Sequence, residues 1–340
     1  MVEQVRAGSG AVASRVRAAL RRDTPGEGAK GASPWVRGRV LAGLAVVTGA
    51  LLAFHRGVPN SVGGAGSLLE AFLPWLGLMV PVLLALAWWR RSALALVALL
   101  LPVVAWTYLF GGLLLPAAGS GPRDLLVVQH NVSDENADPE GTARALAGAG
   151  PDLIALEELV PPALEVYEKT LAPEYPHHAV QGSVGLWSKY PLTEAGLLDI
   201  SPNGIGEGWR RGLRAVVHTP HGEVAAYVAH LPSIRVRASG LASAWRDESA
   251  GLLGKAIDAE KVDALILLGD LNSTVEDRGL APVTSQLNVA KRGMAFSFPA
   301  SLPLARIDQV MARAGTVAQI RTLPATGSDH LPVAARITLE

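Results

Sequence analysis

The 340-residue chain contains no cysteine. This absence excludes disulfide bonds, and it excludes a metal site built from thiolates. It is compatible with an exported bacterial domain, although it does not by itself assign a compartment.

Acidic residues are scarce in the first third of the chain. Residues 1–120 hold 11 Lys and Arg against 4 Asp and Glu, a net charge of +7, whereas residues 121–340 hold 19 against 26, a net charge of −7. A chain of this length predicts one or two domains. The uneven charge predicts a basic N-terminal part and an acidic C-terminal part that have different surroundings.

Charged residues are also missing between Arg91 and Arg123, where the last of three apolar blocks lies; the blocks are residues 40–54, 68–89 and 93–115. The second and third blocks are long enough to cross a hydrocarbon core of about 30 Å, whereas the first needs its flanking residues to do so. A cleaved signal peptide would explain the first block alone. Residues 36–118 therefore predict an anchor of three transmembrane helices. Aromatic side chains that suit its membrane interfaces are Trp75, Trp88, Trp89, Trp106 and Tyr108.

Basic residues around these blocks set the predicted orientation. Eight Lys and Arg precede the first block or sit at its edge, Arg56 is alone in the first loop, and Arg90 and Arg91 fill the second. The positive-inside rule then predicts a multi-pass protein of the cell membrane, with a cytoplasmic N-terminus and residues 121–340 outside. The orientation reverses if the first block does not span. Residues 1–35 are predicted as a basic cytoplasmic tail, in which residues 12–22 form either a helix on anionic lipid or disordered chain.

From Arg123 onward the pattern is that of a water-soluble α/β domain. The hydrophobic runs predict strands at residues 124–129, 153–156, 184–187, 213–218, 224–230, 264–268, 306–311 and 332–337, and helices at 142–149 and 243–257. A turn at residues 220–222 predicts a hairpin between two of these strands. Strands and helices mixed in this way predict a layered α/β sandwich with a cleft at the strand ends.

The most informative stretch is residues 264–272, Ala-Leu-Ile-Leu-Leu-Gly-Asp-Leu-Asn. Its apolar run, ended by Gly269, predicts a strand buried on both faces. Asp270 and Asn272 follow at a spacing of two, which places both side chains on the same side of an extended chain. A carboxylate and an amide in one cleft suit metal or phosphate chemistry. The alternative is a helix cap or an Asx-turn after an ordinary strand.

Polar residues recur where the other predicted strands end. Each of them alone is weak evidence, because a histidine near a loop or an aspartate beside a strand is common. Their repetition at one strand end after another favours a shared site. They are Asn131, Glu158, His230, Asp270, Asn272, Asp308, Asp329 and His330.

The order of these residues closely resembles the endonuclease/exonuclease/phosphatase superfamily, which includes DNase I-like nucleases, inositol polyphosphate phosphatases and sphingomyelinases. Gly-Asp-Leu-Asn at residues 269–272 and Ser-Asp-His-Leu-Pro at residues 328–332 carry the resemblance, which covers residues 123–340. It implies a four-layer α/β sandwich of the DNase I type and a metal-dependent phosphoesterase domain at residues 121–340. Glu157 departs from the pattern, because relatives often carry Gln there.

The resemblance also implies a metal site. Glu158 would hold Mg²⁺ or Mn²⁺, and Asn131 and Asp329 would contribute directly or through water, since hard cations prefer oxygen ligands. Neighbouring residues of a strand point to opposite faces, so Glu157 would point away from the metal.

The remaining residues are implied to be catalytic. Asp270 would orient or deprotonate the attacking water, and Asn272 would donate a hydrogen bond to the phosphate. His230 and His330 would stabilise the transition state, with Asp308 as the carboxylate that holds His330 in place.

The arginines of the domain leave its substrate open. Nuclease and phosphatase share the same catalytic machinery, but nucleic-acid binding rests on Lys and Arg, and this domain is acidic. No stable nucleic-acid complex is therefore expected. Two basic clusters are either a solvated face or a site for one phosphate or pyrophosphate group, and they consist of Arg210, Arg211 and Arg214, and of Arg235 and Arg237.

The predicted anchor followed by a phosphoesterase domain also resembles the actinomycete teicoplanin-resistance membrane proteins. That resemblance implies a role at the cell envelope, with the lipid bilayer as a partner and a lipid-linked (polyprenyl) pyrophosphate as the substrate. The alternative enzyme is a membrane-tethered extracellular nuclease or phospholipase-like phosphodiesterase. A non-catalytic envelope-binding module is the alternative of another class.

Overall fold

The computed structural model describes residues 33, 35–61, 63–116, 121, 124–237 and 240–340. The chain divides into two compact units, one made of Met1–His55 and Leu73–Phe110, the other of Arg56–Phe72 and Gly111–Glu340. Apart from Ser33 and Trp35, the predicted basic tail falls outside the described residues. The second unit contains a stretch of chain that the sequence assigns to the membrane anchor.

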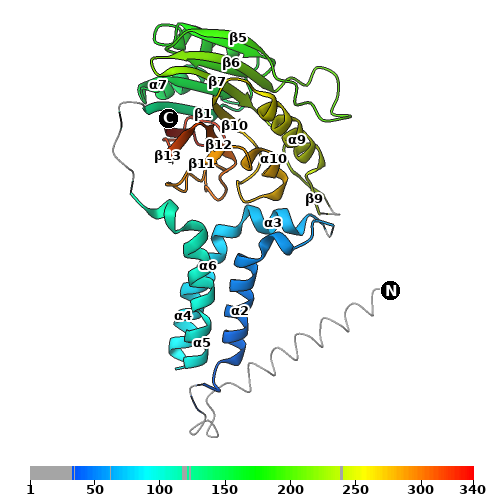
Figure 1. The fold of residues 1–340 in the computed structure, drawn as a ribbon, viewed down its shortest axis with the longest axis vertical. Coiled ribbons are helices and arrows are strands. Elements are labelled where there is room, and N and C mark those ends of the chain that lie inside the picture. Colours follow the sequence, from blue (N-terminus) through cyan, green and yellow to red (C-terminus); the bar gives the residue numbers. More distant parts are fainter. Residues whose placement is uncertain (1–32, 34, 62, 117–120, 122–123, 238–239) are drawn as a thin grey trace. The chain divides into compact units, whose positions relative to one another are not determined.

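The first unit is a small bundle of apolar helices (Figure 1). The helices are α2 (Arg39–Ala53), the 3-10 helix η3 (Leu73–Leu78), α4 (Met79–Trp89), α5 (Ala93–Ala98) and α6 (Leu100–Phe110). They pack through mostly small side chains, which let helix backbones approach closely: Ala42, Ala45, Leu83, Ala87, Ala95 and Leu99.

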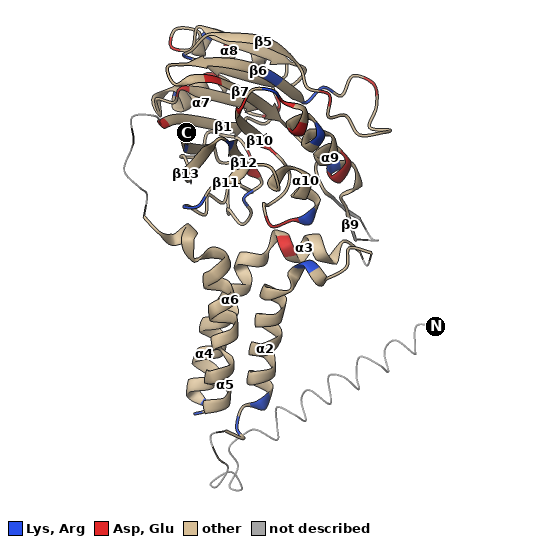
Figure 2. Cartoon of the chain, in the orientation of Figure 1, with Lys and Arg blue, Asp and Glu red and all other residues tan. Residues whose placement is uncertain are grey.

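Charged residues in this bundle are confined to one end. Figure 2 shows α2, α4, α5 and α6 almost free of charge along their length. Ser92, before α5, donates a hydrogen bond to the carbonyl of Arg37, before α2. Arg37 and Arg39 therefore lie at the same end as Arg90 and Arg91.

The prediction of three transmembrane helices is wrong in number. Among the described residues, one straight helical stretch, Ala93–Leu114, is long and apolar enough to cross a membrane. The first predicted span corresponds to α2, whose 15 residues reach only about 22 Å at 1.5 Å per residue, less than a hydrocarbon core.

The second predicted span is interrupted near its start. The chain bends by 68° between helix α3 (Ala65–Ala71) and the helical stretch Leu73–Trp89 that follows it. Glu70 of α3 is fully buried and pairs with Arg278 at 2.8 Å, so this part of the block belongs to the second unit. A carboxylate is costly inside a bilayer, and the pairing explains why the apolar helix cannot begin before Leu73.

The second unit is built on two mixed six-stranded sheets. One sheet has the order β13-β14-β1-β2-β4-β3 and the other has the order β11-β12-β10-β7-β6-β5. The strands of the first are β1 (Asp124–Asn131), β2 (Leu153–Glu157), β3 (His177–Gln181), β4 (Val184–Ser188), β13 (Gly315–Thr322) and β14 (Val333–Leu339). Those of the second are β5 (Leu192–Leu197), β6 (Gly212–Thr219), β7 (Gly222–Ala229), β10 (Ala264–Asp270), β11 (Asn288–Val289) and β12 (Asp308–Arg313). A separate two-stranded ribbon is formed by β8 (Arg235–Arg237) and β9 (Gly240–Ala242).

Helices cover the outer faces of the two sheets, which confirms the four-layer α/β sandwich. Side chains from both sheets share one apolar core, α7 (Pro139–Gly148) and α8 (Ala163–Leu171) pack on β1, β2 and β4, and α9 (Ala244–Ala259) and α10 (Ala281–Thr284) pack on β7 and β10 (Figure 1). In β10, Ile266 and Leu268 face the partner sheet, whereas Leu265 and Leu267 face the helices. The apolar run at residues 264–268 is therefore buried on both faces, as predicted.

The sequence placed most of these elements within a few residues. The hairpin of β6 and β7 is antiparallel and in the predicted position. The sequence missed two helices, α8 and α10, and six strands, β3, β5, β8, β9, β11 and β13. In β5, only two of the six residues are shielded from solvent to any degree, so the strand lacks the hydrophobic run that identifies the others.

Candidate active site

Strand ends from both sheets meet at the residues singled out by the sequence. Asn131 ends β1 and lies opposite Glu157 at the end of β2. In the other sheet, Asp270 ends β10 and lies opposite Asp308 at the start of β12. Asn131 Nδ2 donates a hydrogen bond to Asp270 Oδ2 at 3.1 Å, which joins the two sheets at this edge.

Gly269 allows the strand that carries Asp270 to pass close to its neighbour. Its φ is +154°, and a Cβ atom at this position would lie 1.9 Å from the carbonyl oxygen of Ala229. Next along the chain from Ala229 is His230, and Leu231 N–H donates to the Asp270 carbonyl at 3.0 Å. Glycine is therefore needed here to bring His230 and Asp270 together.

Asp270 and Asn272 form an Asx-turn and share the site at the same time. Asn272 N–H donates to Asp270 Oδ1 at 2.9 Å, and Asn272 Nδ2 lies 3.3 Å from Asp270 Oδ2. The chain is not extended there, because Asn272 has a φ of +48°. The expected proximity is confirmed, but a turn produces it rather than alternation along a strand.

His330 bridges two buried aspartates. Its Nδ1 donates to Asp308 Oδ2 at 2.8 Å, and its Nε2 lies 3.8 Å from Asp270 Oδ2. Asp308 also accepts hydrogen bonds from Ser297 and Gln129. Asp308 is therefore the carboxylate that holds His330, as the resemblance implied.

The titration of this trio follows from its charges. Burial lowers the pKa of His330, but the charges of Asp308 and Asp270 and the hydrogen bond to Asp308 prevail and raise it to about 10. Burial raises the pKa of Asp270 to about 7, helped by the charge of Asp308. For Asp308, burial is outweighed by the charge and hydrogen bond of His330, and its pKa is lowered. His330 is therefore a cation between two acids at neutral pH.

His230 is the neutral histidine of the site. Its Nε2 lies 3.6 Å from Asp270 Oδ2 and 3.9 Å from Glu158 Oε1. Burial, and then the charge of Arg211 at 3.3 Å, lower its pKa well below the usual value. A neutral ring next to an acid can accept or donate a proton, whereas His330 can only donate.

The two adjacent glutamates separate as predicted. Glu158 is 29% exposed in its side chain, whereas Glu157 is fully buried and accepts a hydrogen bond from Gln129 Nε2 at 2.7 Å. Burial, and then the charges of Asp308 and Asp270, raise the pKa of Glu157 well above its usual value. Glu157 is therefore a neutral acid, close in shape and hydrogen bonding to the Gln expected there.

The basic clusters are only partly in the site. Arg211 reaches His230, whereas Arg214 forms ion pairs with Glu260 at 2.9 Å and Glu194 at 2.7 Å. A role of Arg214 in phosphate binding stays a prediction. Arg210 is exposed, with its carbonyl bonded to Ser183 N–H. The side chains of Arg235 and Arg237 lie outside what the structure describes.

Sequence reasoning missed the loop that supports His330. The ring centroids of Phe298 and His330 are 4.8 Å apart. The backbone carbonyl of Ser297 accepts a hydrogen bond from the N–H of Leu331 at 2.8 Å. Asp329 is exposed beside it, and its carbonyl accepts the N–H of Ala300 at 2.7 Å. Nothing in the sequence around Ser297 marks this loop, because its partners are about ten residues or more away along the chain.

The donor atoms fit a hard divalent cation. Asp270, Asp308 and His330 offer ligand atoms within 4.8 Å of one another. Asp308 accepts hydrogen bonds from Gln129, Ser297 and His330, and Asp270 accepts from Asn131 and Asn272. The further oxygens at this edge of the sheets are those of Glu158 and Asn131. Carboxylate and amide oxygens are the ligands that Mg²⁺ and Mn²⁺ prefer.

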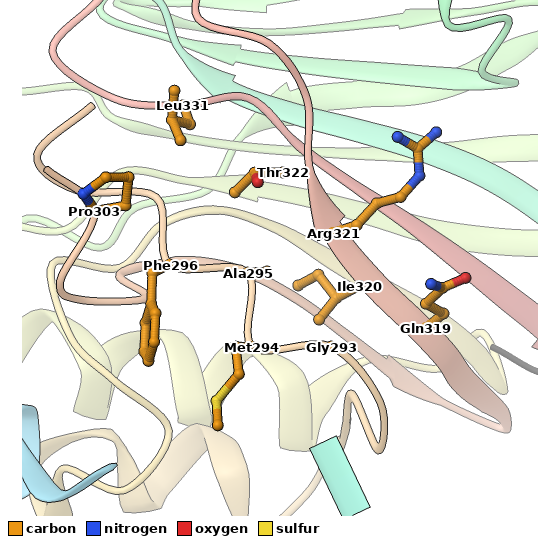
Figure 3. A pocket seen from close by; sticks show the side chains of 10 residues that line it. All are labelled: Gly293, Met294, Ala295, Phe296, Pro303, Gln319, Ile320, Arg321, Thr322 and Leu331. Carbon is orange, nitrogen blue, oxygen red and sulfur yellow. The ribbon is translucent and has the colours of Figure 1, made fainter. Parts of the chain in front are cut away.

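A pocket of about 480 Å³ with a mixed polar and apolar lining lies next to this loop (Figure 3). Its lining includes Met294, Phe296, Ile320 and Leu331, with Arg321 among the polar residues. Leu331 directly follows His330 in the chain. The pocket therefore adjoins the loop that supports the site.

The model of the Endonuclease/Exonuclease/phosphatase family matches residues 128–330, more than half of the chain. The chain belongs to this family. Membership makes it a metal-dependent phosphoesterase, and the matched residues contain the whole strand-end constellation. No curated protein matches the chain.

Solved structures share the fold of this family member. A family protein from Bacteroides thetaiotaomicron has a TM-score of 0.53 and 19% identity, over 65% of this chain and 100% of that one. Beta toxin from Staphylococcus aureus, in a structure with bound magnesium ions, has a TM-score of 0.51 and 15% identity over 64% and 100%. Sphingomyelinase C from Streptomyces griseocarneus has a TM-score of 0.50 and 19% identity over 63% and 99%. At these identities the likeness shows the fold alone.

Proposed function

We propose that the protein is a membrane-anchored, extracytoplasmic phosphoesterase that hydrolyses a lipid-linked (polyprenyl) pyrophosphate in cell-envelope metabolism. The observation that supports hydrolysis most strongly is the convergence of Asn131, His230, Asn272 and His330 on the buried carboxylate of Asp270. A role in glycopeptide (teicoplanin) resistance belongs to the same proposal and rests on the sequence resemblance.

Each residue of the site has one task in this proposal. Asp270 orients the attacking water and takes its proton, and Asn272 donates to a phosphoryl oxygen. His330, kept cationic by Asp308, stabilises the charge that develops on the phosphoryl group in the transition state. His230 donates from the opposite side of Asp270, with Arg211 behind it.

Glu158 is the proposed principal metal ligand, assisted by Asn131 and Asp329. Glu158 is the carboxylate at the site that combines exposure with proximity to His230, 3.9 Å away. When bound, Mg²⁺ or Mn²⁺ neutralises negative charge on the phosphate. The structure of beta toxin with magnesium ions supports the choice of ion.

The surface of the first unit supports a lipid environment. Trp88 and Trp89 are 75% and 79% exposed, and Tyr108 is 87% exposed, on helices that carry almost no charge. Large apolar side chains exposed together in this way indicate a membrane or partner surface. We propose that Arg37, Arg39, Arg90 and Arg91 mark the cytoplasmic end of this unit.

The apolar part of the pocket lining, which includes Met294, Phe296, Ile320 and Leu331, supports a lipid substrate. The N–H of Gly293, in its lining, donates to the carbonyl of Leu113 at 2.9 Å, near the end of the apolar stretch Ala93–Leu114. Another residue of the pocket lining, Leu331, directly follows His330 in the chain. In this proposal, the pocket receives the first part of the hydrocarbon chain while the phosphate lies at Asp270.

Phosphate release by the full-length protein in lipid nanodiscs tests the proposal. The panel contains undecaprenyl pyrophosphate, nucleoside triphosphates, sphingomyelin and duplex DNA, each with Mg²⁺ and with EDTA. Hydrolysis of the lipid pyrophosphate, dependent on Mg²⁺ and well above that of the other compounds, is the expected result. Efficient degradation of DNA would instead support the nuclease alternative, and binding without turnover would support an envelope-binding module.

A further inference from the structure

The stretch Arg56–Phe72 belongs to the phosphoesterase unit although α2 precedes it and η3 follows it. It contains α3 and is called the α3 segment below. The α3 segment contacts the loop that follows the catalytic residue Asn272, residues 273–280, which ends in the short 3-10 helix η5 (Arg278–Leu280). We call that loop the Asn272 loop.

Glu70 is the centre of the contact. Its carboxylate is fully buried and accepts from Arg278 Nε at 3.0 Å and Arg278 Nη2 at 2.8 Å. The same carboxylate accepts from the backbone N–H of Arg278 at 3.0 Å. Since both the side chain and the backbone of Arg278 are bound, Glu70 fixes the chain as well as the guanidinium.

A second contact lies one turn earlier on α3. Ser67 Oγ donates to Asp277 Oδ1 at 3.2 Å, and Ser67 is buried. A Cβ atom on Gly66 would lie 2.7 Å from Arg278 Nη2 and 2.6 Å from the carbonyl of Val58, so glycine permits the close approach. The α3 segment is therefore fitted to this loop at neighbouring positions.

Buried polar contacts continue from the loop to the catalytic acid. Arg246 Nη2 donates to Asp277 Oδ2 at 2.9 Å, and Arg246 Nη1 donates to Ser273 Oγ and to the Asn272 carbonyl at 3.4 Å. The side chains of Arg246 and Asp277 are 0% and 1% exposed. Asn272 in turn donates to Asp270 through its backbone and its amide.

Asn272 needs such support because of its backbone conformation. A φ of +48° is uncommon for a residue other than glycine and persists only where neighbouring groups hold it. Arg246 binds the carbonyl of Asn272, and Leu231 accepts from its side chain at 2.9 Å. Movement of the loop would release the first of these contacts.

We propose that Glu70 is a positioning residue, through which the α3 segment holds the Asn272 loop in its active geometry. The inference rests on the proposed phosphoesterase activity and adds a dependence of that activity on the juxtamembrane part of the chain. A domain cut at residue 121 retains Asp270 and Asn272 but loses this support. Misplacement of reacting groups by about 1 Å typically lowers the rate by about 10²-fold.

The test uses the full-length protein in detergent with Mg²⁺ and bis(p-nitrophenyl) phosphate. Glu70→Gln, which keeps the shape of the side chain, is expected to lower kcat about 10- to 100-fold with KM changed less than about threefold. Arg278→Gln should have a similar effect, and the double variant should lose no more than the worse single variant. Amide hydrogen exchange in residues 273–280 should rise in each. Glu140→Gln, which removes an Arg ion pair on α7, is the matched control and should leave kcat and loop exchange unchanged.

A purely structural role of Glu70 would give a different result. In that case Glu70→Gln would lower the melting temperature while kcat, measured well below that temperature, stays within about twofold of the wild type, and the proposal would be overturned. Arg278→Lys keeps the charge and gives a second, milder variant if Glu70→Gln does not fold. A wild-type protein inactive toward both bis(p-nitrophenyl) phosphate and undecaprenyl pyrophosphate would instead overturn the proposed function itself.

Discussion

His330, in the loop before β14, donates a hydrogen bond from Nδ1 to Oδ2 of Asp308, at the start of β12, at 2.8 Å. The contact fixes the ring so that Nε2 points toward Asp270, 3.8 Å away. It also helps to keep the ring protonated. Burial lowers the pKa of His330, but the charges of Asp308 and Asp270 and the hydrogen bond to Asp308 together outweigh burial and raise the pKa to about 10. In the proposed mechanism this fixed cation lies beside the reacting phosphate, which is the arrangement that electrostatic catalysis requires.

Replacement of either partner should therefore lower turnover. His330→Ala is expected to reduce kcat by about 10²–10³-fold, the usual loss for one donor to a developing charge. Asp308→Asn should follow in the same direction, because the ring loses both its charge and its orientation. The combination should be no worse than His330→Ala alone. Turnover of bis(p-nitrophenyl) phosphate measures this, with His218→Ala on β6 as control. Normal turnover in Asp308→Asn would show that the pair has no catalytic role.

Glu157→Gln should be mild in activity and should change the pH dependence of stability. The pKa of Glu157 in the folded protein is raised above its value of 4.5 in the unfolded chain. Its contribution to the free energy of unfolding is therefore fully present below pH 4.5 and is lost as the pH rises toward the pKa of the folded protein. Glu157→Gln has no such loss. The difference in unfolding free energy between the variant and the wild type should therefore grow in favour of the variant by about 1 kcal/mol per pH unit above pH 4.5. Thermal unfolding in EDTA from pH 4 to 9 measures it. Parallel curves for the two proteins would show that Glu157 ionises normally.

The sequence predicts the centre of the catalytic unit better than its periphery. The apolar run ending at Gly269 could be assigned because burial on both faces leaves a continuous hydrophobic signal. The pairing of His330 with Asp308 came from family resemblance, and no local pattern would have supplied it. The ion pairs of Arg214 with Glu260 and Glu194 could not be predicted, because a cluster of arginines in sequence does not reveal acidic partners on other elements.

The anchor was misread for a related reason. Hydropathy averages over a window, so one carboxylate at Glu70 does not interrupt an apolar block in that average. The structure shows that this carboxylate is bound by Arg278, more than two hundred residues away along the chain. A long-range ion pair of this kind has no signature in a hydropathy window.

Glu158→Gln tests the metal assignment. Loss of the negative charge of the Glu158 side chain should raise the Mg²⁺ concentration for half-maximal activity by at least about 10-fold. High Mg²⁺ concentrations should partly restore the activity of the variant. Glu157→Gln is the matched control, since it removes the neighbouring carboxylate, and it should shift the Mg²⁺ dependence little. A larger shift for Glu157→Gln would mean that the wrong carboxylate was assigned to the ion.

The proposed orientation can be tested with reporters fused after Glu340. Alkaline phosphatase should be active there and a cytoplasmic fluorescent protein should be dark, if the arginine end of the first unit faces the cytoplasm. Replacement of Arg37, Arg39, Arg90 and Arg91 by Gln should weaken this preference. A fluorescent, phosphatase-negative fusion of the wild-type chain would place the catalytic unit in the cytoplasm.

The central claim is that Asp270 and its neighbours perform metal-dependent phosphoester hydrolysis. Its most direct test is inorganic phosphate release from undecaprenyl pyrophosphate by the full-length protein in nanodiscs, compared with Asp270→Asn, in Mg²⁺ and in EDTA. The proposal predicts release only by the wild-type protein with Mg²⁺, and a loss of at least about 10²-fold in Asp270→Asn. Release that persists in EDTA, or that is equal in Asp270→Asn, would contradict it.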